Sequence, residues 1–114
     1  MKENTKVLGT KGEVLASQIL KQKGYQIIAT NYCNKIGEID VIAKQEDTLV
    51  FVEVKTRSSV KFGLPSQAVN YPKQKKIRTV ALSYLKATKN LDVPCRFDVI
   101  EIVGKEYRHI ENAF

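Results

Sequence analysis

The chain has 114 residues, of which 43% are hydrophobic and 27% charged, and its formal net charge is +7. This length suits one domain (residues 1–114) with its own core, and no apolar run approaches the roughly 20 residues that cross a bilayer. The polar N-terminus lacks the apolar segment of a signal peptide, so we expect a cytoplasmic protein with no membrane partner.

The cysteines and the histidine exclude the usual zinc sites. The chain has two cysteines, Cys33 and Cys95, outside any CxxC pair, and one histidine, His109. These are too few soft ligands for zinc. We expect both cysteines to serve as small apolar side chains.

The first predicted element is a helix over residues 7–23. Ala16 and Leu20 widen an apolar stripe along one side, and Gly24 is placed to end the helix. Glu13 lies at the border of this stripe. It is either a surface residue or a carboxylate directed at the strands that follow.

A short strand is predicted over residues 25–31, and a hairpin of two strands follows within residues 37–57. Ile39, Val41 and Ala43 are expected to share one face of the first hairpin strand. A tight polar turn within residues 45–48 fixes the register. This register puts Asp40 opposite Glu53, and Glu38 opposite Lys55.

The hairpin therefore brings two carboxylates together on an otherwise apolar pair of strands. Paired residues have Cβ atoms about 4.5–5.5 Å apart. Two like charges at roughly 5 Å repel by about 3 kcal/mol at an effective dielectric constant near 20. A divalent cation would remove this repulsion, because Mg²⁺ binds carboxylate oxygens. The alternative is a solvated face with cross-strand Glu–Lys pairs, which we prefer for Glu38 and Lys55 alone.

A second helix is predicted over residues 72–87, preceded by a Ser/Gly/Pro-containing loop and a helical turn at residues 66–70. Pro72 suits the first turn of this helix. Its core-facing residues are expected to be Ile77, Val80, Ala81, Tyr84 and Leu85. Strands over residues 97–103 and 106–110 complete the order α-β-β-β-α-β-β. The sequence thus predicts an α/β fold with a mixed β-sheet flanked by helices, in which the second helix permits a parallel pair of strands.

Positive charge is concentrated in one part of the chain. Between Val54 and Leu91 there are nine basic residues and no acidic one, whereas the rest holds ten basic and twelve acidic residues. This pattern indicates a polyanion partner, with nucleic acid ahead of a membrane surface. A solvated lysine-rich helix explains the charge equally well. The candidate contacts are Arg57, Lys61, Lys73, Lys75, Lys76 and Arg78.

Several of these segments resemble a known pattern. A helical glutamate, an aspartate in one strand and E-x-K in the next are similar to the PD-(D/E)xK nuclease superfamily. This superfamily has the restriction-endonuclease-like fold and includes the archaeal Holliday junction resolvases. More closely, the chain resembles the YraN family of small bacterial proteins predicted to be nucleases. The matching segments are GE at Gly12, GEIDVIA from Gly37, FVEVKTR from Phe51, AxxYL from Ala81 and RFDV from Arg96.

The resemblance implies roles for residues of this chain. Asp40 and Glu53 would be metal ligands, with the backbone carbonyl of Val54 as a third, for Mg²⁺ or Mn²⁺. Lys55 would orient or help deprotonate the attacking water, and Glu13 would support the metal or its water shell. Accessory candidates are Glu38, and Gln67 with Tyr71, which match a Q-x-x-x-Y pattern.

We therefore expect a metal-dependent nuclease that cleaves phosphodiester bonds in DNA, which we favour over RNA, and structured or branched DNA is compatible with the pattern. Two alternatives stay open. One is a nucleic-acid-binding module that keeps the nuclease fold without cleaving. The other is an assembly or regulatory protein with a basic interaction face. A homodimer is compatible with the sequence, which specifies neither the oligomeric state nor the preferred substrate.

Overall fold

Two helices and five strands follow the order that the sequence predicts. The computed structural model describes residues 5–57 and 62–114, with side chains from Lys11 onward. The helices are α1 (Thr5–Gln22) and α2 (Tyr71–Ala87), and a 3-10 turn, η1 (Pro65–Gln67), precedes α2. The strands are β1 (Gln26–Cys33), β2 (Glu38–Gln45), β3 (Thr48–Arg57), β4 (Cys95–Val103) and β5 (Glu106–Ile110).

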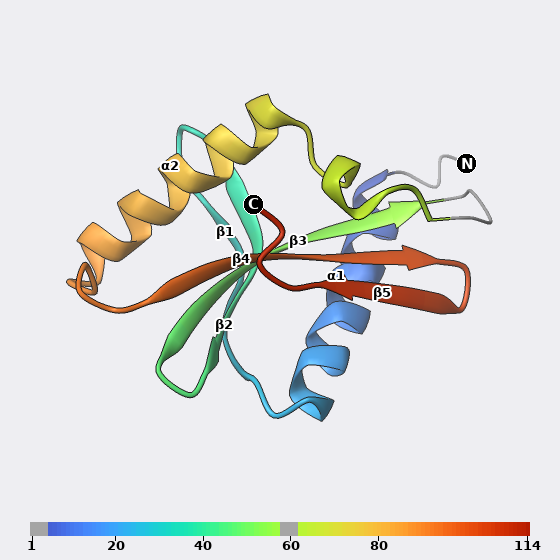
Figure 1. Cartoon of the computed structure of the whole chain (residues 1–114), viewed down its shortest axis with the longest axis horizontal. Helices are drawn as coiled ribbons and strands as arrows, with labels where there is room; N and C mark the ends of the chain where they lie inside the picture. The colour runs from blue at the N-terminus through green and yellow to red at the C-terminus, as the bar shows by residue number, and fades with distance from the viewer. Residues whose placement is uncertain (1–4, 58–61) are drawn as a thin grey trace.

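The five strands form one mixed sheet in the order β1-β2-β3-β4-β5. Neighbouring strands are antiparallel except β3 and β4, which are parallel because α2 carries the chain back between them. Figure 1 shows the two helices on opposite sides of the sheet. The predicted α/β fold is confirmed, and it is consistent with a restriction-endonuclease-like fold.

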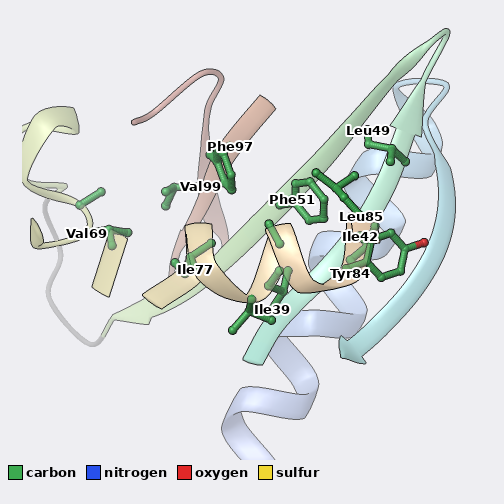
Figure 2. Packing of buried hydrophobic residues seen from close by; sticks show 13 residues of the cluster. Ile39, Ile42, Leu49, Phe51, Val69, Ile77, Tyr84, Leu85, Phe97 and Val99 are labelled. Atoms are coloured by element: carbon green, nitrogen blue, oxygen red, sulfur yellow. The ribbon is translucent and has the colours of Figure 1, made fainter. Parts of the chain in front are cut away.

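Both faces of the sheet are covered, so its central strands carry apolar side chains on both sides. On one face, Phe51 of β3 packs with α2, whose five predicted core residues are all buried (Figure 2). On the other face, Val50 and Val52 pack with Ala16 and Leu20 of α1. An acidic residue in the middle of these strands therefore lies inside the protein.

Local signals explain where the helices begin and end. The Asn70 side chain caps α2 by accepting a hydrogen bond from the Lys73 amide, and Pro72 lies in the first turn. After α1, Gly24 adopts a φ of +93°, which only glycine takes without strain. Among the described residues, no helix is long and apolar enough to cross a bilayer.

The prediction is wrong about the end of β1 and about the burial of the cysteines. β1 extends to Cys33, two residues beyond the end of the predicted strand, so Tyr32 and Cys33 belong to the sheet. Cys33 and Cys95 are exposed, not packed as small core side chains, because they lie at the ends of β1 and β4.

Candidate metal and nucleic-acid site

The β2–β3 hairpin positions the predicted carboxylates. Its turn is two residues long and starts at Glu46, whose φ of +54° is the left-handed conformation that such a turn favours. Gln45 therefore faces Thr48, and the pairing continues to Val41 opposite Val52. The predicted register is confirmed over this length.

Beyond the Val41–Val52 pair, the Asp40 side chain takes the place of a backbone carbonyl as the hydrogen-bond acceptor for β3. Asp40 Oδ2 accepts a hydrogen bond of 2.8 Å from the amide of Val54. Ile39 packs on the α2 side of the sheet, whereas Val41 packs on the α1 side. The prediction that Ile39 and Val41 share a face is wrong, because the strand does not alternate strictly through Asp40.

The hairpin pairing also stops before the predicted Glu38–Lys55 pair. Glu38 is exposed and lies opposite Cys33 of β1, while Lys55 lies opposite Glu101 of β4. The ladder between β2 and β3 is described from Gln45–Thr48 to Val41–Val52. Asp40 and Glu53 come next on their strands, at the end of this ladder.

Three carboxylates, Glu13, Asp40 and Glu53, form what we call the acidic centre. Asp40 and Glu53 are 8% and 7% exposed. Burial, and then the charge of Asp40, raise the pKa of Glu53 from its ordinary 4.5 to about 7. The same two causes, in the same order, raise the pKa of Glu13, which is half-buried on α1. The predicted metal-binding carboxylates are thus close enough to influence one another.

Two lysines offset part of this negative charge. Lys73 Nζ, in the first turn of α2, lies 3.5 Å from Glu53 Oε2. The charges of Lys73 and Lys55 both lower the pKa of Glu53, without reversing the effect of burial. Lys73 is predicted only as a nucleic-acid contact. Its proximity to Glu53 depends on how α2 crosses the sheet, which the sequence does not specify.

The acidic centre offers the hard oxygen donors that Mg²⁺ and Mn²⁺ prefer. Glu53, whose pKa is raised by burial and then by the charge of Asp40, fits a divalent cation, which would offset the repulsion between the two carboxylates. Among the described side chains, no three His, Cys, Asp or Glu residues converge closely enough to complete a metal site alone. A cation would therefore need Asp40 and Glu53 together with backbone or water oxygens, of which the Val54 carbonyl stays a predicted ligand.

The predicted basic contacts on α2 lie at its first turns. Lys75 and Lys76 are exposed. The Arg78 guanidinium lies 5.0 Å from the centre of the Phe97 ring, so its stem is packed against the C-terminal half of the sheet. Tyr71 is 68% exposed, and Lys75 Nζ lies 5.6 Å from its ring centre. These side chains are accessible to a large partner.

The remaining predicted contacts precede α2. Arg57 ends β3 and donates a hydrogen bond to the buried carboxylate of Glu101. Gln67 is exposed in η1. Lys61 lies outside the described residues. Arg57 and the α2 lysines thus belong to different elements.

Sequence reasoning misses two buried carboxylates on β4. Asp98 accepts hydrogen bonds from Arg96, from His109, depending on the tautomer of its ring, and from the Asn112 amide. Burial alone would raise the pKa of Asp98, but these hydrogen bonds outweigh it and the pKa is lowered. Glu101 is held by Arg57 and Arg108. The signal that could have found both is an acidic residue at two positions of an otherwise apolar strand.

Comparison with known proteins gives a family without an assigned activity. Residues 12–102 match the family described as "Uncharacterised protein family UPF0102". A UPF0102 protein of Alkaliphilus oremlandii is 53% identical over 96% of this chain and 98% of its own length. The UPF0102 protein of Clostridioides difficile is 49% identical over 97% of this chain and 99% of its own length. That of Thermodesulfovibrio yellowstonii is 50% identical over 94% of this chain and 95% of its own length. The matched residues include the whole acidic centre.

Proposed function

The chain belongs to the UPF0102 family, which is the YraN family that its sequence resembles, and we propose that it is a metal-dependent nuclease. It would cleave phosphodiester bonds in DNA, favoured over RNA, including structured or branched DNA, in the cytoplasm. Asp40 and Glu53 would hold Mg²⁺ or Mn²⁺, with Glu13 beside them. The family name assigns no activity, so the support comes from the chemistry of the acidic centre.

The observation that carries this function is the burial of Glu53 beside Asp40, which raises the pKa of Glu53. A structural carboxylate is normally buried with enough hydrogen bonds or opposite charge to stay ionised. Glu53 is buried beside Asp40, and the two nearby lysines leave its pKa at about 7. Such a pair destabilises the fold on its own and becomes favourable when a cation binds, which is typical of a functional site.

Different side chains of the protein would have different roles in the reaction. A divalent cation held there would supply electrophilic stabilisation of negative charge on the phosphate. The Val54 amide fixes the carboxylate of Asp40. Lys55 Nζ, two residues after Glu53 on the same face of β3, would hold the attacking water and favour loss of its proton. The exposed lysines of α2 would bind the nucleic-acid backbone.

The first test replaces Lys55. Lys55→Ala is expected to lower the cleavage rate by about 10²–10⁴-fold, the usual cost of losing a group that orients or transfers a proton. DNA affinity should be nearly unchanged, because Lys55 is one cation among many. The measurement is cleavage with Mg²⁺ or Mn²⁺ of single-stranded, duplex and branched DNA and of matching RNA. Melting temperature and affinity are determined on the same preparations.

Two further variants complete the design. Lys44→Ala, an exposed lysine near the hairpin turn, controls for the loss of any one charge. Mn²⁺ should raise the melting temperature of the wild type, because it binds only the folded hairpin, and should fail to do so for Asp40→Asn.

The outcomes separate the alternatives. A folded Lys55→Ala variant that cuts as fast as the wild type refutes the role of Lys55. A wild type that binds DNA but cuts no substrate with either metal favours the non-catalytic binding module. A wild type that binds no nucleic acid favours an assembly or regulatory protein.

A further inference from the structure

A row of charged side chains crosses three strands beside the acidic centre. Lys55 of β3 lies opposite Glu101 of β4, and Glu101 lies opposite Arg108 of β5. Residues in register on neighbouring strands project from the same face, about 4.8 Å apart. Arg57, two residues beyond Lys55, projects from this face as well. It is the face on which Phe51 packs with α2.

Glu101 holds two guanidinium groups in fixed positions. Its side chain is 1% exposed, and its Oε2 accepts a hydrogen bond of 2.9 Å from Arg57 Nε. Its Oε1 accepts a hydrogen bond of 2.9 Å from Arg108 Nε and another from Arg108 Nη2. Burial and charge-assisted hydrogen bonds restrict the rotamers of both arginines.

This cluster has more positive charge than Glu101 needs. One arginine neutralises one carboxylate, so two arginines leave a net charge of +1 on the cluster. The Arg57 side chain is 36% exposed and Arg108 is 24% exposed, with the Phe62 ring centre 4.8 Å from the Arg108 guanidinium. Within the described residues, Arg57 bonds Glu101 through Nε, which leaves its terminal amino groups for another acceptor.

We propose that Arg57 and Arg108, oriented by Glu101, form a phosphate site for the nucleic-acid backbone next to the acidic centre. Arg57 is four residues beyond Glu53, roughly 13 Å along the strand, so this phosphate is a neighbour of the one that is cut. That position rests on the proposed nuclease function. A planar guanidinium binds a phosphodiester through two parallel hydrogen bonds, which fixes direction as well as affinity. The site thereby sets the path of one strand across the end of β3.

The test measures the affinity of fluorescein-labelled 20-nucleotide single-stranded and duplex DNA, in EDTA so that no cleavage occurs. Arg57→Met should weaken binding by about tenfold, the effect of one charge-assisted contact. It should also reduce the slope of log affinity against log salt by about one. Arg57→Lys keeps the charge, so it should restore the slope and recover only part of the affinity. Lys44→Met is the matched control and should change little, because Lys44 lies opposite Leu49, which is eight residues before Arg57 on β3.

Glu101→Gln tests the proposal by the direction in which DNA affinity changes. Removal of a negative charge would by itself tighten DNA binding, whereas loss of the residue that orients both arginines weakens it. We expect weaker binding, with melting temperature used to verify folding. If Glu101→Gln does not fold, Arg108→Lys replaces it, because it keeps the ion pair and loses the fork geometry; it too should bind more weakly.

The outcomes distinguish this proposal from the nuclease itself. If Arg57→Met binds DNA as Lys44→Met does, with an unchanged salt slope, or if Glu101→Gln binds more tightly, the cluster is a structural ion pair and the phosphate site is refuted. Metal-dependent cleavage by the wild type would still support the nuclease in that case. A wild type that binds neither DNA probe overturns both.

Discussion

The ionisation of Glu53 opposes folding in the absence of a bound cation, because its pKa of about 7 in the folded protein lies above the ordinary 4.5. Below pH 4.5 the group is protonated in both states. Between pH 4.5 and 7 the folded state binds more protons than the unfolded state, so stability falls as pH rises. A shift of this size corresponds to about 3 kcal/mol.

Glu53→Gln should remove this loss of stability. Without divalent metal, the wild-type free energy of unfolding should fall between pH 4.5 and 7 by up to about 3 kcal/mol more than that of the variant. Chemical denaturation at a series of pH values in EDTA measures the difference. Glu38→Gln, an exposed carboxylate at the start of β2, is the control and should follow the wild type. Parallel profiles for the wild type and Glu53→Gln would contradict the raised pKa.

At the scale of elements, the sequence is most informative where contacts are local. The hairpin register could be predicted because a two-residue turn joins adjacent strands. The change of face at Asp40 could not be predicted, because the Asp40 side chain takes the place of a backbone carbonyl as hydrogen-bond acceptor there. The pairs Lys73–Glu53 and Arg57–Glu101 also escape prediction, because each joins elements whose relative placement depends on the crossover through α2.

The approach of α1 to β3 depends on Gly12. A Cβ atom at this position would lie 2.6 Å from Thr56 Oγ1 and 3.5 Å from Val54 Cγ1. The clash should outweigh the better helix propensity of alanine, so we expect Gly12→Ala to lower the free energy of unfolding by about 1 kcal/mol.

A double-mutant cycle tests this contact. In a Thr56→Ala background the nearest atom is gone and the Thr56 Cβ lies 3.9 Å from the added methyl, so Gly12→Ala should become neutral or stabilising. Equal effects in both backgrounds, measured by denaturant unfolding, would show that Thr56 does not limit the approach of α1.

Across the whole molecule, part of the excess positive charge lies beside the acidic centre. The net charge is +7, and the basic stretch between Val54 and Leu91 includes the end of β3 and all of α2. Lys55 and Lys73 lie near Glu53, while Lys75 and Lys76 are exposed beyond them. This distribution would attract a polyanion towards the carboxylates, which would otherwise repel it.

Replacement of Lys73, Lys75, Lys76 and Arg78 by Ala should therefore weaken DNA binding and flatten its salt dependence. The slope of log affinity against log salt is expected to fall by about three to four units, since each neutralised phosphate contributes about 0.9. The control replaces four exposed lysines outside this stretch, Lys11, Lys21, Lys35 and Lys44. An equal loss of slope in both variants would mean that net charge alone governs binding.

The segment from residue 106 onward supplies partners to carboxylates that precede it in the chain. Arg108 bonds Glu101, and His109 lies 2.8 Å from Asp98. During translation, β4 therefore lacks these counter-charges until β5 has left the ribosome. The sheet is completed last at this edge, where Arg108 joins Glu101 and Arg57. The position of Glu101 between its two arginines is therefore fixed only after the last strand has been synthesised.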